Sequence, residues 1–186
     1  MIRLLLLALC VLPASLLARC PPLQGEALQQ MHDRLITRGR WETRFEQKNH
    51  IHVLEQPLVS NGTVAVDPDR GVVWQVLSPI ESRIEVSDAG LTIDAQSVAQ
   101  SQLVAALLQA LLSGDLGTLD QTFELRACVT DERWTLELLP RAEGFRQRLT
   151  GLTITGDDDL KTLEVEQPGG NTLHIEFEPP RALDAH

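Results

Sequence analysis

Two groups of side chains in this sequence could bind a metal ion. His50 and His52 are two positions apart and would point the same way from a β-strand, but no third ligand follows at a suitable spacing. Residues 157–159 are three consecutive aspartates that could contact calcium, yet they lack the spaced ligands of an EF-hand loop. We therefore expect a solvent-facing strand and a polar turn at these places, and no metal site.

The sequence contains none of the common catalytic motifs. There is no Gly-x-Ser-x-Gly elbow, phosphate-binding glycine loop or His-Glu-x-x-His helix. This favours a binding protein over an enzyme, and we expect no cofactor. Asn61-Gly62-Thr63 fits a glycosylation pattern, but Asn-Gly is also the strongest two-residue hairpin signal. We expect a hairpin turn there, between strands at residues 51–60 and 63–66.

Composition excludes several classes of protein. The chain has 186 residues, of which 43% are hydrophobic, and 16 basic residues stand against 26 acidic ones, a net charge of −10. This hydrophobic share is too high for a disordered chain, and the length suits one domain with a real core. The negative charge opposes binding to nucleic acid or to an anionic lipid surface.

The first 18 residues read as a secretory signal peptide. Arg3 precedes an apolar run from residue 4 to residue 11, which Pro13 ends before several small residues. We expect cleavage after Ala18, which leaves a single domain at residues 19–186. A lipobox ending at Cys20 is the alternative, but such boxes need a small residue before the cysteine, and Arg19 is not small.

Two cysteines remain after the signal peptide is removed, Cys20 and Cys128. In an oxidising compartment two thiols tend to pair, so we expect a disulfide that closes a loop of more than 100 residues. The alternative is that Cys128 is an inert strand residue and Cys20 a free thiol near the new terminus.

Hydrophobic periodicity predicts an α+β protein. Apolar residues at helical spacing predict a first helix over residues 24–38. Most later segments alternate apolar and polar residues, which is typical of antiparallel strands with one wet face. About ten such strands in one sheet must curl, so the apolar face becomes concave. The predicted strands, besides the two flanking Asn61-Gly62, are 41–47, 72–77, 83–86, 91–93, 123–129, 133–138, 160–165 and 172–178.

An uncharged segment at residues 95–114 predicts a second helix, apolar around most of its girth. It is too short to span a bilayer. It could be a central helix in an ordinary core, or a lid over a lipid-sized cavity in the curved sheet.

Four segments, taken in order, resemble the periplasmic lipoprotein carrier family typified by LolA. Their order and spacing cover most of the mature chain. They are residues 45–47 (FEQ), which resemble a first-strand Phe-x-Gln; residues 62–79, a run of glycine, strand, proline, aromatic strand and proline; residues 86–90 (VSDAG); and residues 177–180 (FEPP), a closing Phe-x-Pro-Pro.

This resemblance implies an incomplete, strongly curved antiparallel β-barrel with helices over its concave apolar face. It also implies a monomeric periplasmic carrier that moves acylated lipoproteins from an inner-membrane exporter to an outer-membrane acceptor. One departure stands out. Family carriers have an arginine before the proline of the third strand that holds the lid shut when empty, whereas this chain has Asp67 there and Arg70 three residues later.

Apolar strand residues and three lid leucines are the candidate acyl-binding residues. An ordinary filled core would show the same alternation, so a cavity remains one of two interpretations. Two other functions stay open: a carrier of another acylated lipid or polyene, which Asp67 favours, and a regulatory domain that senses mislocalised lipoprotein. The candidates are Trp41, Phe45, Val72, Trp74, Val76, Ile84, Val86, Leu91 and Ile93 from the strands and Leu107, Leu108 and Leu111 from the lid.

Overall fold

The structure is a computed structural model that describes residues 20–35, 39–87, 89–97, 110 and 115–183. In the first half it has α1 (Gly25–Leu35), β1 (Trp41–His50), β2 (Leu58–Asp67), β3 (Gly71–Ser78), β4 (Ser82–Ser87), β5 (Gly90–Ile93) and β6 (Gln96–Ser97). In the second half it has α3 (Leu116–Thr122), β7 (Phe123–Val129), β8 (Trp134–Pro140), α4 (Glu143–Arg146), β9 (Gly151–Gly156), β10 (Leu160–Glu166), β11 (Thr172–Phe177) and β12 (Arg181–Ala182).

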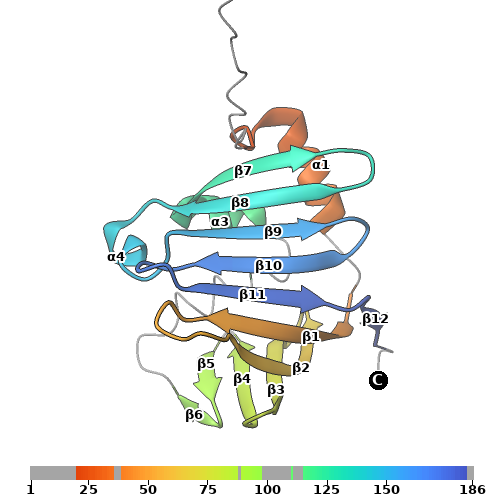
Figure 1. Cartoon of the computed structure of the whole chain (residues 1–186). Coiled ribbons are helices and arrows are strands. Elements are labelled where there is room, and N and C mark those ends of the chain that lie inside the picture. Colours follow the sequence, from red (N-terminus) through yellow and green to blue (C-terminus); the bar gives the residue numbers. More distant parts are fainter. Residues whose placement is uncertain (1–19, 36–38, 88, 98–109, 111–114, 184–186) are drawn as a thin grey trace, which may run out of the picture.

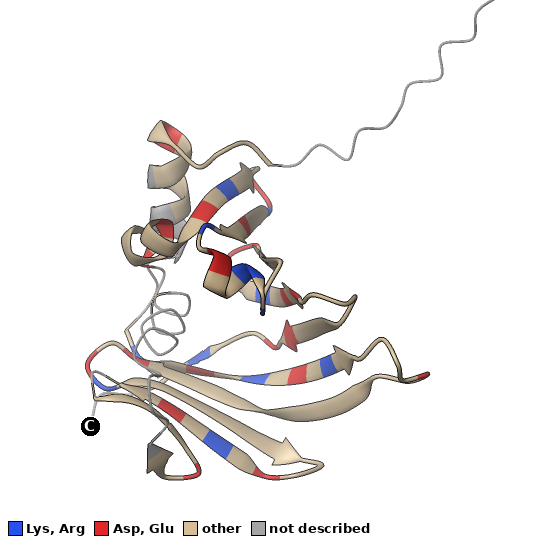
Figure 2. Ribbon diagram, turned by 90° about the vertical axis from the view of Figure 1, so that its left-hand side faces the viewer, with Lys and Arg blue, Asp and Glu red and all other residues tan. Residues whose placement is uncertain are grey.

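The twelve strands of the described chain form one antiparallel sheet. Their order is β6-β5-β4-β3-β2-β1-β11-β10-β9-β8-β7, and β12 also pairs with β1. The end strands β6 and β7 do not pair with each other, so the sheet is not closed. The sheet bends strongly, and α1 and α3 lie on its concave side (Figures 1 and 2). The predicted curved, incomplete barrel with helices on the concave face is confirmed.

Strand register places the apolar positions of all the long strands on one face. Val64 of β2 lies between Thr43 of β1 and Trp74 of β3, and Trp74 is in turn opposite Ile84 of β4. On the other side of β1 the same face continues through further paired residues of β11, β10, β9, β8 and β7. These are Ile175, Leu163, Ile154, Leu136 and Ala127.

Four of the five largest completely buried side chains among the described residues lie on α1, α3 and β8. They are Met31 of α1, Leu119 of α3, and Leu136 and Leu138 of β8. Packing of this kind stabilises the helices, since a helix as short as α3 is marginal alone. No helix within the described ranges is long and apolar enough to cross a membrane.

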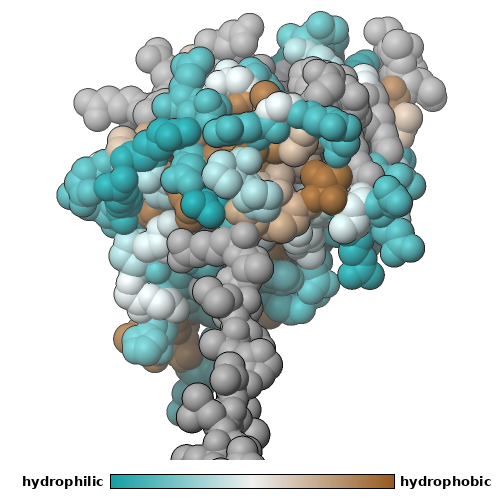
Figure 3. Space-filling model, turned by 90° about the horizontal axis from the view of Figure 1, so that it is seen from above, coloured by the Kyte–Doolittle hydropathy of each residue, from teal (hydrophilic) through white to brown (hydrophobic). Residues whose placement is uncertain are grey.

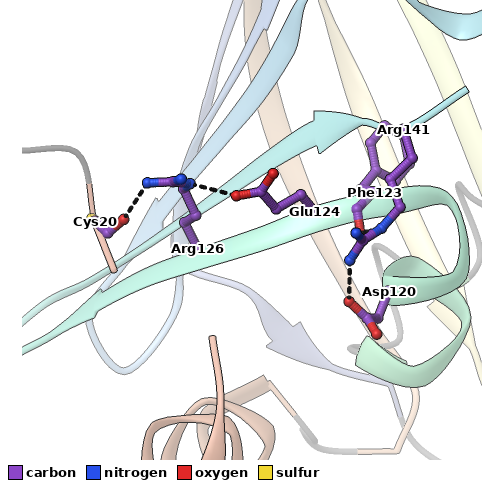
Figure 4. A network of polar contacts seen from close by, with 6 residues as sticks. All are labelled: Cys20, Asp120, Phe123, Glu124, Arg126 and Arg141. Carbon is purple, nitrogen blue, oxygen red and sulfur yellow. Dashed lines mark hydrogen bonds and ion pairs between the residues drawn. The ribbon is translucent and has the colours of Figure 1, made fainter. Parts of the chain in front are cut away.

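The first described residues line the outer edge of β7. The Ala127 amide donates to the carbonyl of Pro21 at 3.0 Å, and the Leu23 amide donates to that of Leu125 at 2.9 Å. A disulfide joins Cys20 to Cys128. The Arg126 guanidinium lies between the Cys20 carbonyl and the Glu124 carboxylate (Figure 4). This segment therefore satisfies part of the hydrogen-bonding edge of the last strand.

The prediction of a hairpin turn at Asn61-Gly62 is wrong. Both residues lie inside β2, and the turn between β1 and β2 is at residues 51–57. Gly62 is opposite Phe45, and a Cβ atom there would collide with the Gln75 carbonyl oxygen and lie 2.9 Å from the Phe45 ring. The pairing of β2 with β3 shifts between Asn61 and Gly62. The glycine thus marks a β-bulge and a close approach.

The beginning of the predicted helix at residues 95–114 is also wrong. Asp94 and Ala95 both have positive φ, 49° and 64°, and form the turn of a hairpin that leads into β6. Beyond Ser97, only Ala110 of that segment is described; it is helical and buried. The predicted signal peptide at residues 1–18 lies outside the described residues. β9 and α3 were not expected from the sequence.

Candidate functional site: the concave face

Three aromatic rings meet near the middle of the concave face. The ring centroids of Phe45 and Trp74 are 4.3 Å apart, and Phe177 meets Trp74 edge-on at 6.1 Å. They come from β1, β3 and β11, which the register brings together although they are far apart in the chain. Phe45 and Phe177 are buried, whereas Trp74 is only half-buried. The Trp74 indole is therefore the ring of this aromatic group that remains accessible to solvent.

The nine described candidate residues all lie on this concave face, but their exposure differs. Phe45, Val72, Val86 and Leu91 are buried, and Ile93 at the edge is 40% exposed. The three lid candidates, Leu107, Leu108 and Leu111, lie outside the described residues. The half-buried candidates are Trp41, Trp74, Val76 and Ile84.

The two ends of the concave face differ in how they are packed. At the β7–β9 end, α1 and α3 bury the apolar side chains almost completely. At the β3–β5 end, Trp74, Val76 and Ile84 keep part of their apolar surface accessible. Partly exposed apolar surface at this end is what a hydrophobic ligand would need to contact.

The concave face has half-buried polar side chains at Gln47, Asn49 and Ser60, toward the β1–β2 turn, and none of these lies among Trp74, Val76 and Ile84. Thr43 is the one buried polar side chain among the described residues. Its hydroxyl donates to the backbone carbonyl of Glu178 at 2.6 Å, so the group is already satisfied. Binding around Trp74, Val76 and Ile84 would therefore rest on apolar contact, which constrains the orientation of a ligand much less than hydrogen bonds do.

Comparison with known families agrees with this geometry. The model of the family described as "Outer membrane lipoprotein carrier protein LolA-like" matches residues 24–174. This chain belongs to the LolA-like family. No functionally curated protein matches its sequence.

Several solved structures are similar to this LolA-like chain. A LolA superfamily protein from Nitrosomonas europaea is 11% identical over 85% of this chain and 94% of its own, with a TM-score of 0.48. MucB is 16% identical over 85% of this chain, with a TM-score of 0.48, and the chain spans only 59% of MucB's length. The MucA/MucB complex of Pseudomonas aeruginosa is 13% identical over 85% of this chain and 57% of the matched chain, with a TM-score of 0.43.

Asp67 departs from the family pattern, and its carboxylate is held within the sheet. Arg40 Nε lies 2.8 Å from Asp67 Oδ2, and Arg70 Nε lies 3.9 Å from the same oxygen. The Asp67 side chain is 15% exposed. This pair joins the start of β1 to the end of β2.

A groove of about 530 Å³ opens on the opposite, polar face, and no sequence pattern predicted it. Its walls come from β1, β2, the end of β3 and the region of β11, segments that only the folded sheet brings together. Glu46 raises the pKa of the nearby Lys48, through a hydrogen bond and its charge, with a smaller effect from Glu176. The lining residues are Arg44, Phe45, Glu46, Asn61, Gly62, Leu77, Glu176, Phe177 and Glu178.

The two candidate metal-binding groups lie at surface turns. His50 ends β1, and the backbone amide of His52, in the following turn, donates to Asn171 Oδ1 at 2.8 Å. Asp157 begins the turn between β9 and β10, where its carboxylate accepts from the Asp159 amide at 3.0 Å and pairs with Lys161 at 3.2 Å. That backbone hydrogen bond is the main cause that lowers the pKa of Asp157. The polar turn expected at residues 157–159 is confirmed.

Proposed function

We propose that this protein is a periplasmic carrier that binds acyl chains on its concave face and moves lipoproteins from the inner to the outer membrane. The observation that carries the proposal is the apolar surface of the concave face, left partly accessible at Trp74, Val76 and Ile84. Membership of the LolA-like family supports it. In this proposal an exporter in the inner membrane loads the protein, an acceptor in the outer membrane unloads it, and no bond is cleaved.

The energetics of acyl chains explain why such a carrier needs this kind of surface. Each methylene moved out of water contributes about 0.8 kcal/mol, so a chain of about sixteen carbons contributes roughly 12 kcal/mol. Sheltering part of that surface keeps the cargo soluble. Apolar contacts without hydrogen bonds can be exchanged stepwise for those of an acceptor, which allows release.

A second candidate is a carrier of another acylated lipid or a polyene on the same scaffold. The Asp67–Arg40 pair favours it, because a carboxylate stands where family carriers have the lid-closing arginine. A carrier with a different closing mechanism could accept a different cargo.

A variant pair tests whether the concave face binds the ligand. Ile84→Asn places an amide on the concave face, while Val73→Asn makes a similar change at a half-buried position on the outer face of the neighbouring strand. We expect Ile84→Asn to weaken binding of a fluorescent fatty acid about tenfold, because one apolar contact is lost. Val73→Asn should leave the affinity unchanged. Equal affinities for wild type and Ile84→Asn would place the ligand elsewhere.

Mass spectrometry of lipids that co-purify with the protein from periplasm identifies the cargo. Triacylated peptides would support lipoprotein transport, whereas free lipid or a polyene would support the second candidate. Protein that carries no hydrophobic molecule and does not bind the fluorescent fatty acid would contradict both.

A further inference from the structure

Exposed apolar side chains gather at one end of the sheet. Of the eight large hydrophobic side chains that are exposed among the described residues, six belong to the β1–β2 turn, the β3–β4 turn and the adjoining strand ends. We call these six the apolar rim. They are Val53, Leu54, Leu58, Val59, Leu77 and Ile80.

Strand register shows that the two turns are neighbours. Asn61 of β2 pairs with Ser78, the last residue of β3. The first residues of β2, Leu58 to Ser60, therefore extend past β3 and run beside the β3–β4 turn at residues 79–81. The β1–β2 turn lies just beyond them, at the left-hand end of β1 in Figure 1. Val53 and Ile80, on these turns, are 83% and 78% exposed.

The apolar rim has hydrophobic side chains on both faces of the sheet. Leu58 is on the concave side, in line with Val64, whereas Val59 and Leu77 are on the outer side, where neighbouring positions are polar. A protein partner packed on one face would cover only one of these groups. A bilayer interface surrounds a projecting turn on all sides and would cover both groups together.

The charges at the apolar rim restrict the kind of membrane. Residues 51–60 and 77–82 contain no lysine or arginine, and their only carboxylates are Glu55 and Glu81. These acidic groups would be repelled by anionic lipid and would keep insertion shallow. By contrast, the surface at the α1 and β7 end is mostly hydrophilic, with some hydrophobic side chains between the hydrophilic ones (Figure 3).

We propose that the apolar rim inserts shallowly into an electrically neutral phospholipid surface. This proposal rests on the proposed carrier function and adds the place where the protein meets the membrane. Leu58 and Val76 continue the apolar concave face to this end of the sheet. An acyl chain leaving the bilayer here would meet Leu58 and Val76 before it reaches Trp74, with the polar side chain of Ser60 beside them on the same face.

Vesicle flotation tests the proposal with the full mature protein. Wild type should float with pure dioleoylphosphatidylcholine vesicles, and less with an equimolar mixture containing dioleoylphosphatidylglycerol. The double variant Val53→Gln/Ile80→Gln should weaken partition about a hundredfold, roughly tenfold for each side chain. Leu28→Gln, which changes an exposed leucine on α1 far from the rim, is the matched control and should float as wild type does.

Binding of the fluorescent fatty acid without vesicles separates this proposal from the carrier function. All three proteins should bind the probe equally. The rim proposal is overturned if wild type fails to float, if the double variant floats as well as wild type, or if the double variant loses probe binding. It is also overturned if sedimentation shows a wild-type dimer that the double variant lacks, since a second copy would then cover the rim. If the protein binds the probe but does not bind vesicles, only the rim proposal is wrong and the carrier function stands.

Discussion

Gly62 has a larger structural role than its place inside a strand suggests. It lies between Phe45 on β1 and the backbone of Gln75 on β3, at the bulge where the pairing shifts. Because glycine has no side chain, the Phe45 ring can lie over it and approach Trp74 to 4.3 Å. One residue without a side chain thus sets the position of the aromatic group on the concave face.

Replacing Gly62 should therefore destabilise the protein. We expect Gly62→Ala to lower the free energy of unfolding by about 1–3 kcal/mol, because the new methyl group collides with backbone that cannot move freely. Gly144→Ala is the matched control, since nothing lies within 4 Å of a Cβ atom there. Urea unfolding followed by tryptophan fluorescence measures both. Equal stability of the two variants would show that the sheet tolerates the collision.

The same residue shows where sequence reasoning at this scale fails. Asn-Gly predicts a hairpin from local backbone preference alone. The requirement for glycine here comes from the Gln75 carbonyl, thirteen positions later, and from Phe45, seventeen positions earlier, and only strand pairing brings these groups into contact with it. A long-range steric requirement and a local turn preference select the same residue type, so the pattern could not distinguish them.

At the scale of elements, the segment before α1 completes the sheet at β7. It pairs along that strand through Pro21 and Leu23 and is joined to it by the disulfide from Cys20 to Cys128. Arg141 fixes the other end of the strand, because it pairs with Asp120 of α3 and donates to the Phe123 carbonyl (Figure 4). Both ends of β7 are thus fastened to elements outside the sheet.

Removing the disulfide should cost stability. The crosslink joins residues 108 positions apart, and a loop of that size gives about 4–5 kcal/mol in the chain-entropy description, with measured losses of about 2–5 kcal/mol. We expect Cys20→Ser/Cys128→Ser to lose an amount in this range in urea unfolding. Reductant should bring wild type to the same midpoint and leave the double variant unaffected. A wild-type midpoint insensitive to complete reduction would contradict this.

Elements were predictable from the sequence where alternation was long. β7 has its predicted bounds at residues 123–129, because three buried apolar residues alternate there with charged or polar ones. β9 was missed because Gly151–Gly156 is short, begins and ends with glycine and has no charged residue to mark its outer face. The start of β6 was misread as a helix because neighbouring uncharged residues dominate the pattern.

The whole molecule combines a packed end with an end that keeps apolar surface accessible. The completely buried Leu136 and Leu138 lie at the packed end, and the half-buried Trp74 and Ile84 lie at the accessible end. Alternation predicted the single apolar face and its curvature. It could not predict this gradient, because buried and half-buried residues have the same sequence pattern. The gradient depends on where α1 and α3 pack.

Hydrogen exchange should reveal this gradient. In the ligand-free protein we expect the amides of β8 and β9 to exchange most slowly and those of β4 and β5 faster, since fewer buried contacts resist opening there. A saturating fatty acid should slow exchange in β3 to β5 more than in β8 and β9. Ile84→Asn protein under the same ligand concentration is the control and should change less. Uniform slowing along the sheet would contradict a ligand site at the β3–β5 end.

The bond between Cys20 and Cys128 also bears on how this protein could be attached to a membrane. Sulfur in a disulfide uses both of its valences, one to its own Cβ and one to the partner sulfur. A diacylglycerol group joined to Cys20 as a thioether would need the second of these. Each molecule can therefore have either the crosslink or a lipid at this cysteine, and a lipidated form would leave Cys128 as a free thiol on the exposed side of β7.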